Sequence, residues 1–545
     1  MCKIPVPSRI NVEFLRRNAE GFDDMAVLEF LEFGFPINYE GPPISSTREV
    51  PNYKGALDYP DHIDAYLEKE VANGNVIGPF DVCPLDDPVF SPLNSVPKKD
   101  SEDRRVINDH SFPKDPRDGP SINRGIPYRF YQGEPLLLIL PTVDRLVAIV
   151  IKKGPGCLLW KRDLHAAYRN YKYDPGEVHL AGYIWKGKMY FDTVESMGGR
   201  TGAQACQRPT NLVCHISKKI DCEMVGYLDD FASADVAERA WLAFEKARVL
   251  LEACGLEESA KKAWPPSTRM PFLGLVIDTV RLTLEVPEEK LEELKKLLRD
   301  WRQASSATKK EMQSLCGLLN FVAACVPAGR VFMFRLFEFI RLAPDLGKFP
   351  LGDGARADIQ WWCTYLPLFN GVGLIPEPNW SKPDAYFSVD ACLAGAGGMC
   401  GREYFHCPIP SQLQGVDINT LELRTLLVAL RLWAPRLAGC RVQVFCDNWA
   451  TVVTLNSGKA SSPQFQAAHR EIFLLLARHQ VLLRVKHVRS EANRAADLLS
   501  RWHLDPNNER QFRREYGHLH PRRIDVDASL FNYSVNWLVN ADAIQ

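Results

Sequence analysis

The chain has 545 residues, of which 46% are apolar and 24% charged, so it is long enough for several globular domains, each with its own core. A net charge of -1 excludes an overall basic chain, so any basic surface must be local. Fifteen cysteines without a CxxC pair or a Cys/His cluster at zinc spacing argue against a disulfide framework and a zinc knuckle, and they predict reduced thiols in an intracellular protein, cytoplasmic or nuclear.

The start of the chain predicts neither secretion nor membrane anchoring. MCKIPVPSRINVEFLRR lacks the apolar core of a signal peptide. The longest apolar stretch, PLLLILPTVDRLVAIVI, is interrupted by Pro141, Asp144 and Arg145. We therefore expect no membrane partner.

Residues 1–78 are expected to form an N-terminal extension that packs on the next domain and carries no chemistry. AVLEFLEFG and DHIDAYLEKEVANGNVIG predict helices, joined by the proline-rich connector INYEGPPISS. The second helix is expected to end at the turn-forming pair Asn73 and Gly74.

Two adjacent carboxylates, Asp229 and Asp230, stand in the segment MVGYLDDF. Apolar and β-prone neighbours predict a hairpin with both acids at its tip, although such a pair alone is typical of a solvated turn. Asp163 follows the strand-like run CLLW and precedes a helix-like AAYRNY. Carboxylates on two neighbouring strands suit a pair of divalent ions about 4 Å apart, as used for in-line phosphoryl transfer. Oxygen ligands favour Mg²⁺, with Mn²⁺ as the alternative ion.

Five segments follow one another in an informative order: DLHAAY, SMGGRTGAQACQR, YLDD, GLEESAKKAW and FLGLVID. In order and approximate spacing they resemble the palm motifs of reverse transcriptases. The resemblance implies fingers and palm at residues 79–280 and thumb and connection at 281–380. It also implies catalytic residues and metal ligands: Asp163, Asp229, Asp230 and the carbonyl of Leu164. Lys262 would be the general acid toward pyrophosphate, with a plain surface pair with Lys261 as the alternative.

The same resemblance implies residues that contact the incoming nucleotide. VFSPLNSVPKKDSEDRRVINDH predicts a hairpin that presents cations to a triphosphate, and the family pattern falls on Lys98 and Arg104, to within one residue at each. A solvated charged loop is the alternative. Tyr168 would lie beneath the sugar and exclude a 2′-hydroxyl by steric clash, or else be a core tyrosine.

The segment from Ser196 to Arg208 would form the loop and helix that support template and nucleotide. Met197 and Gly198 would lie at the nucleotide, where glycine allows close backbone approach. The segment departs from the family at Met197, where Gln or Phe is common, and at Ala203, where proline is frequent. These departures concern nucleotide selectivity and loop rigidity.

The thumb and connection region begins with strands in FLGLVID and RLTLEV. EEKLEELKKLLRDWRQ then predicts an amphipathic helix, suited to tracking a phosphate backbone or to ordinary solvation. Thr308 and Glu311 predict a capping box for the following helix. LIPEPNWSKPD predicts an interdomain linker.

A second set of acids follows the linker, at residues 381–503. Asp390 ends an apolar strand, Glu422 lies on an amphipathic helix, Asp447 ends another strand and Asp497 lies on a later helix. This order resembles the metal-binding carboxylates of RNase H, in which two metal ions activate water against a phosphodiester. His487 would move protons or assist product release, or else be structural.

Nearly the whole chain resembles one branch, the DIRS-type retrotransposons, which pair a reverse transcriptase and RNase H with a tyrosine recombinase. The resemblance includes HSFPKDPRDGPSINRGIP and a C-terminal tail at 504–545. The sequence contains no recombinase or aspartic protease motif, so we expect integration to come from another chain or to have been lost.

The expected fold is therefore an α/β and α+β multidomain chain, a right-hand polymerase followed by a connection and an RNase H-like domain. The expected function is RNA-directed and DNA-directed DNA synthesis with RNase H activity, with two Mg²⁺ ions in each site. Its partners would be an RNA template, a DNA primer, an RNA–DNA hybrid and deoxynucleoside triphosphates. The alternative is a decayed or domesticated element product that binds nucleic acid without catalysis, against which the retention of all seven metal-site carboxylates argues.

Overall fold

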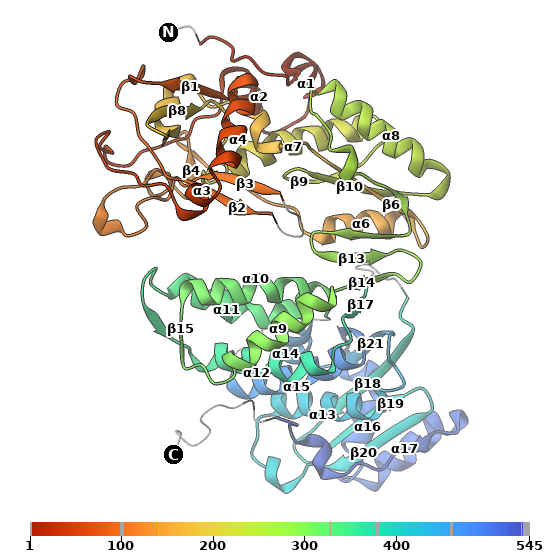
Figure 1. Ribbon diagram of the computed structural model, residues 1–545. Helices are drawn as coiled ribbons and strands as arrows, with labels where there is room; N and C mark the ends of the chain where they lie inside the picture. Colours follow the sequence, from red (N-terminus) through yellow and green to blue (C-terminus); the bar gives the residue numbers. More distant parts are fainter. Residues whose placement is uncertain are drawn as a thin grey trace. The chain divides into compact units, whose positions relative to one another are not determined.

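The computed structural model describes residues 3–98, 103–136, 138–326, 329–375, 382–457, 462–535 and 537 (Figure 1). These residues form a mixed α/β multidomain fold, as predicted. The chain divides into two compact units, Met1–Met270 and Pro271–Gln545. The five domains expected from the sequence are finer than this division and stay predictions. Most of the expected linker, residues 376–381, lies outside the described residues.

The N-terminal extension contributes to the core of the first unit, as predicted. Leu15 of α1 (Val12–Asn18) and Leu28 of α2 (Ala26–Phe33) are buried in the same cluster as Trp160 and Leu212. The later helix α4 (Pro60–Ala72) ends at Asn73, as predicted. The other helices of this unit are α3 (Lys54–Asp58), α5 (Ile122–Gly125), α6 (Val143–Lys153), α7 (Gly202–Lys219) and α8 (Ala237–Ala253).

A four-stranded sheet in the order β11-β6-β10-β9 forms the centre of the first unit. α7 packs on β9, and α8 packs on β6 and β10 (Figure 1). β6 and β10 are buried along most of their length, and the buried residues include four polar ones, Arg162, Asp163, Ser233 and Asp235. The strands are β6 (Leu158–Asp163), β9 (Val225–Tyr227), β10 (Asp230–Asp235) and β11 (Trp264–Ser267).

Smaller sheets complete the first unit. β2 and β3 form the predicted antiparallel hairpin, with Pro97 opposite Arg104, and its tip lies outside the described residues. A three-stranded sheet has the order β1-β8-β7, and β4 pairs with β5. The strands are β1 (Val76–Phe80), β2 (Leu93–Pro97), β3 (Arg104–Asn108), β4 (Phe130–Tyr131), β5 (Glu134–Pro135), β7 (Gly182–Trp185) and β8 (Lys188–Asp192).

The second unit begins with a helical layer beside a small antiparallel sheet. β13 (Leu275–Asp278), β14 (Thr283–Glu285) and β17 (Val372–Leu374) neighbour one another, and the boundary between the units falls within β12 (Arg269–Phe272). The predicted amphipathic helix is α9 (Glu288–Trp301). Thr308 and Glu311 form the predicted capping box of the next helix. The remaining elements of this layer are α10 (Lys309–Cys325), α11 (Phe334–Leu342), α12 (Asp353–Tyr365), β15 (Ser306–Thr308) and β16 (Lys348–Pro350).

A six-stranded sheet in the order β22-β21-β18-β19-β20-β23 follows. The first three strands along the chain are antiparallel neighbours, and β18, β21 and β22 are parallel. Helices α13 and α16 both pack on β18 and β19 (Figure 1). The strands are β18 (Ala385–Ala391), β19 (Gly395–Cys400), β20 (Glu403–Pro408), β21 (Arg441–Cys446), β22 (Leu482–His487) and β23 (Arg522–Arg523). The helices are α13 (Ile418–Trp433), α14 (Trp449–Ser457), α15 (Pro463–Arg478), α16 (Arg494–Ser500) and α17 (Pro506–Tyr516).

The helical layer and the six-stranded sheet of the second unit share buried polar contacts. Asp358 of α12 is fully buried and pairs with Arg470 of α15 at 2.8 Å and with Arg335 at 2.9 Å. The indole of Trp361 donates to the Arg470 carbonyl. Because a buried carboxylate left without its partners is costly, these contacts tie the two layers together.

Two local predictions need correction. The helix-like segment AAYRNY after Asp163 forms only a short 3₁₀ helix (Ala167–Asn170), because Ala166 lies in the left-handed region with φ 48°. The tip of the central hairpin is formed by Leu228 and Asp229, while Asp230 is already the first residue of β10.

No helix in the described part of the chain is both long and apolar enough to cross a membrane. The described cysteines are free thiols, and more than half of them are buried.

Candidate functional site

The central sheet brings three sequence-predicted carboxylates to one end of two neighbouring strands. Asp163, the last residue of β6, lies directly opposite Asp230 in the antiparallel register. Asp229 occupies the adjoining turn, and its carbonyl accepts a hydrogen bond from the Leu164 N–H at 2.9 Å. The register of a single strand pair therefore gathers Asp163, Leu164, Asp229 and Asp230.

Burial and neighbouring carboxylates raise the pKa of Asp229 and of Asp230. Burial and the charge of Asp163 raise the pKa of Asp229. Burial raises the pKa of Asp230 to about 6, and Lys161, at 3.4 Å, opposes that rise. Partly buried carboxylates that destabilise one another's charged forms are a fitting environment for divalent cations, which reverse the sign of the local field. The oxygen donors suit Mg²⁺.

Lys262 lies at this cluster. Its Nζ pairs with Asp163 Oδ1 at 2.8 Å, and its side chain is 62% exposed. Hydrogen bonding to Asp163 raises the pKa of Lys262, so the ammonium group keeps its proton while it stays accessible. The geometry separates Lys262 from Lys261, for which the structure gives no such partner among the described residues.

Helix α7 holds the hairpin that carries the acids. Gln207 donates to the Gly226 carbonyl at 2.9 Å and accepts from the Leu228 N–H at 2.8 Å. Thr210 donates to the Leu228 carbonyl at 2.6 Å. Leu228 has φ 52°, a conformation that a branched side chain rarely adopts, and these bonds compensate it. The sequence predicted a supporting role for the segment that contains Gln207 but did not single this residue out, and it did not predict Thr210. Polar residues on the apolar face of an amphipathic helix are the signal that points to them.

Tyr168 lies between the acid cluster and the glycine-rich segment. A β-carbon on Gly202, the first residue of α7, would lie 2.7 Å from the Tyr168 ring. Burial raises the pKa of Tyr168 to about 12, and the charge of Asp229 adds to the rise. The ring is half-buried and keeps an accessible surface beside the acids.

Gly198 and Met197 sit against the β2–β3 hairpin. The Asn108 N–H donates to the Met197 carbonyl at 3.1 Å. Gly198 has φ 130°, and a β-carbon there would lie 2.1 Å from the Asn108 carbonyl oxygen, so only glycine fits. Met197 is 37% exposed.

The two predicted cations of the β2–β3 hairpin are already partnered. Lys98 pairs with Asp103 at 3.1 Å. Arg104 donates twice to Ser95 at 2.7 Å, and its guanidinium lies 3.5 Å from the Tyr59 ring centroid. Arg105, one residue on, is exposed.

The second unit gathers the other four predicted acids. Asp390 lies on β18, Glu422 on α13, Asp447 directly after β21 and Asp497 on α16. Burial raises the pKa of Asp390 to about 7, and the charges of Asp447 and Asp497 add to the rise. Burial raises the pKa of Glu422 well above its ordinary value, and the charges of Asp390 and Asp447 contribute. These charge interactions at Asp390 and Glu422 link all four acids in one cluster.

Hydroxyl and guanidinium groups support this second cluster. Ser500 donates to Asp390, Ser490 donates to Asp447 at 2.6 Å, and Arg501 pairs with Asp497 at 2.7 Å. The sequence did not predict these three partners, because only folding brings them close to the acids.

One thiol also lies at the second cluster. The Sγ of Cys446 and the carboxylate oxygens of Glu422 and Asp447 lie within 4.8 Å of one another. Burial raises the pKa of Cys446, so its thiol stays protonated and does not compete with the carboxylates for a hard cation. The donor set therefore still fits Mg²⁺ held by carboxylates.

His487, the last residue of β22, lies at the rim of the second cluster. Its Nε2 is 3.1 Å from the Asp447 carbonyl oxygen, and the side chain is exposed. Its ring also contacts that of Trp449, with centroids 5.4 Å apart.

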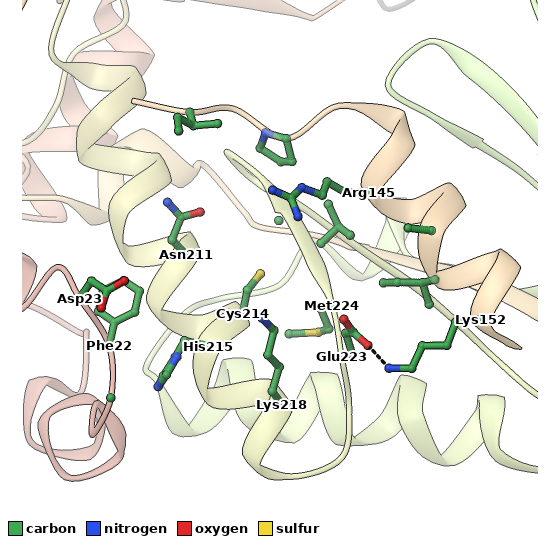
Figure 2. Close-up of a pocket in the computed structure, with 17 residues that line it drawn as sticks. Phe22, Asp23, Arg145, Lys152, Asn211, Cys214, His215, Lys218, Glu223 and Met224 are labelled. Atoms are coloured by element: carbon green, nitrogen blue, oxygen red, sulfur yellow. Dashed lines mark hydrogen bonds and ion pairs between the residues drawn. The ribbon is translucent and has the colours of Figure 1, made fainter. Parts of the chain in front are cut away.

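A cavity of about 600 Å³ opens beside the β9–β10 hairpin, between α6 and α7 (Figure 2). Arg145 and Lys152 line it from α6, and Lys218 lines it from α7. Glu223 pairs with Lys152 at 2.9 Å. Its floor is formed by residues 224–226, which lead into the acid-bearing turn.

No family model and no curated protein matches the chain. Among solved structures, it is similar to a foamy viral protease–reverse transcriptase, dRH, in complex with double-stranded DNA (TM-score 0.46, 16% identity, covering 90% of this chain and 83% of that chain). It is also similar to the foamy viral protein with double-stranded DNA (0.45, 14%, 90% and 99%) and with an RNA/DNA hybrid (0.42, 15%, 89% and 64%).

Proposed function

We propose that the protein is an RNA-directed and DNA-directed DNA polymerase with a separate RNase H site. The observation that carries the proposal is the presence of two distinct carboxylate clusters, one on an antiparallel strand pair and one on a mixed sheet. In each cluster, burial and neighbouring carboxylates raise the pKa of two acids, Asp229 and Asp230 in the first and Asp390 and Glu422 in the second, and the donor atoms suit Mg²⁺. Two-metal chemistry serves both DNA synthesis and hybrid cleavage.

In the polymerase site, Asp163 and Asp229 would hold two Mg²⁺ ions, with Asp230 and the Leu164 carbonyl as further ligands. When bound, the ions would activate the primer 3′-hydroxyl and stabilise the departing pyrophosphate. Lys262, protonated and accessible, would deliver a proton to that pyrophosphate.

The nucleotide would lie over Tyr168, between the acids and the loop at Met197 and Gly198. The half-buried ring is fixed by the close approach of Gly202, so it presents a firm surface that excludes a 2′-hydroxyl. The triphosphate would meet the cations of the β2–β3 hairpin, Lys98 and Arg104. Since Arg104 is held by Ser95, the exposed Arg105 is the alternative within one residue.

In the RNase H site, Asp390, Glu422, Asp447 and Asp497 would hold two Mg²⁺ ions against the scissile phosphate of the RNA strand. His487, exposed at the rim, would accept or donate a proton as the product leaves. The hydroxyl groups of Ser490 and Ser500 would orient the carboxylates to which they donate.

The cationic cavity between α6 and α7 would contact the phosphate backbone of the primer–template duplex. Arg145 and Lys218 provide positive charge near the hairpin, although the whole chain is nearly neutral. On the basis of the sequence resemblance, we also propose that the chain comes from a DIRS-type retrotransposon, with a tyrosine recombinase on a separate chain.

The test is primer extension on an RNA template with Mg²⁺ and deoxynucleotides, run beside cleavage of an RNA–DNA hybrid. Asp229→Asn is expected to abolish synthesis and leave cleavage, and Asp497→Asn to do the reverse. Loss of both activities in either variant, with the fold retained, would mean a single shared site. Binding of duplex without either activity in the unaltered protein would support the non-catalytic alternative.

A further inference from the structure

A group of buried polar side chains lies behind the loop that carries Met197 and Gly198. Glu195 is fully buried, and neither of its carboxylate oxygens has a hydrogen-bond partner of normal geometry among the described residues. His110 is also buried, and its Nδ1 has no hydrogen-bond partner among the described residues. Buried polar atoms are rarely left unpaired, because each costs its full desolvation penalty.

Two of these unpartnered atoms and the Tyr173 hydroxyl lie close to Gly199. A β-carbon built on Gly199 would lie 3.5 Å from His110 Nδ1, 3.6 Å from the Tyr173 hydroxyl and 3.7 Å from Glu195 Oε2. Three polar atoms from separate segments therefore surround the position that a β-carbon of residue 199 would occupy. A buried water needs two to four such partners.

The same groups hold the loop itself. The Tyr173 hydroxyl accepts from the Ser196 N–H at 3.0 Å and lies 3.1 Å from its hydroxyl. His110 Nε2 lies 3.3 Å from the Ser196 hydroxyl. On the other side of the loop, Asn123 donates to the Gly198 carbonyl at 2.7 Å and accepts from the Arg200 N–H at 2.8 Å.

We propose that His110, Tyr173 and Glu195 bind a buried water molecule beside Gly199, and that neutral Glu195 is a positioning residue for the loop at residues 196–202. The positioning role of Glu195 rests on the proposed polymerase activity, since the loop would support the incoming nucleotide. Glu195 acts through the water and the loop and does not touch substrate. A neutral carboxyl supplies one donor and remaining acceptors, which a water-centred network needs.

Burial favours the neutral form of Glu195 in the physiological range. Burial raises the pKa of Glu195 to about 8, although the Tyr173 and Thr201 hydroxyls oppose the rise. Burial lowers the pKa of His110 to about 4, so that ring is uncharged above this pH. Asp192 is paired with Arg169 at 2.8 Å. The groups that face Glu195 are His110, Tyr131, Tyr168, Tyr173, Asp192 and Cys206, and the pKa of each tyrosine and of Cys206 is raised.

Amide hydrogen exchange of the loop tests the proposal without relying on catalysis. Comparing the full-length protein with Glu195→Gln at each pH cancels the intrinsic pH dependence of exchange. The ratio of loop exchange rates, unaltered over Glu195→Gln, is expected to rise several-fold as the pH passes about 8. A ratio that stays constant across this range would overturn the role of Glu195. Glu238→Gln, an exposed acid on α8, is the control and is expected to match the unaltered protein.

Gly199→Ala tests the water itself. Its methyl group would meet only ordinary contact distances, so a site without water predicts little change. If the water is present, the methyl displaces it and leaves His110 Nδ1 and Glu195 Oε2 unpaired, and loop exchange should accelerate several-fold at every pH. Exchange unchanged by Gly199→Ala would overturn the water site. In parallel, the KM for deoxynucleotide should rise above pH 8 in the unaltered protein but not in Glu195→Gln. A pH-dependent exchange ratio without any polymerase activity would retain the loop inference and refute the proposed function.

Discussion

The two acidic clusters balance their charge by different means. In the first, Lys161 and Lys262 lie against Asp230 and Asp163, so cations of the chain offset part of the repulsion. In the second, Arg501 pairs with Asp497, but Asp390 and Glu422 have no cationic partner among the described residues; Asp390 accepts from the Ser500 hydroxyl, and its pKa rises to about 7. A hydroxyl supplies a dipole and not a charge. The second cluster should therefore depend more on bound cations than the first.

The largest effect should come from Asp390→Asn. The amide keeps the shape of the carboxyl and an acceptor for Ser500, but it removes a metal ligand, so hybrid cleavage should fall more than about a hundredfold. In the absence of Mg²⁺ the same change should stabilise the protein by roughly 1–2 kcal/mol at pH 8, because the folded state then holds an ionised Asp390 against a raised pKa.

Thermal unfolding with a metal chelator measures that stability, and Asp163→Asn provides the comparison. Because Asp163→Asn breaks the ion pair with Lys262, we expect it to give a smaller gain or none. Equal stabilisation by both variants would show that the lysines do not offset the first cluster.

Lys262→Gln separates the role of a proton donor from that of a charge neighbour. If Lys262 protonates pyrophosphate, the rate of nucleotide incorporation should fall by about 10² or more, with little change in duplex affinity. Lys261→Gln is the matched control and should leave the rate unaltered. Single-turnover incorporation measures the step directly. Equal rates for the two variants would show that Lys262 and Lys261 are a surface pair and that Lys262 is not the proton donor.

Ser500→Ala and Ser490→Ala test the support of the second cluster. Each removes a hydroxyl that donates to a carboxylate, so the Mg²⁺ concentration needed for half-maximal cleavage should rise by about 10-fold or more. Ser411→Ala, at an exposed serine of the same unit, should change nothing. DNA synthesis should keep its Mg²⁺ requirement in all three variants. A changed requirement would show that the two clusters are coupled.

The smallest effect is expected in the cationic cavity. Arg145→Gln combined with Lys218→Gln removes two charges that would meet phosphates, so the salt dependence of duplex affinity should become shallower by up to about two units of slope. Fluorescence anisotropy at several salt concentrations measures this slope. An unchanged slope would place the duplex elsewhere.

The acid-bearing elements could be predicted from the sequence because their signals are local. Strand-like runs ending on Asp163 and Asp447 and the helix carrying Glu422 follow from apolar periodicity. The Thr308 and Glu311 capping box was predicted for the same reason. The turn at Leu228 and the 3₁₀ segment after Ala166 were not, because a left-handed backbone at a residue other than glycine is maintained by contacts from elsewhere in the fold.

By itself, the sequence determined the order of the elements, the two sets of acids and the glycine that must stand at position 198. Only the tertiary structure decided which groups meet these acids: the strand register that sets Asp163 opposite Asp230, the serines at Asp390 and Asp447, and the buried space between His110, Tyr173 and Glu195. The reason is physical. Periodicity and turn chemistry act over a few residues, whereas charge balance and hydrogen bonding depend on atoms that folding brings together from distant parts of the chain.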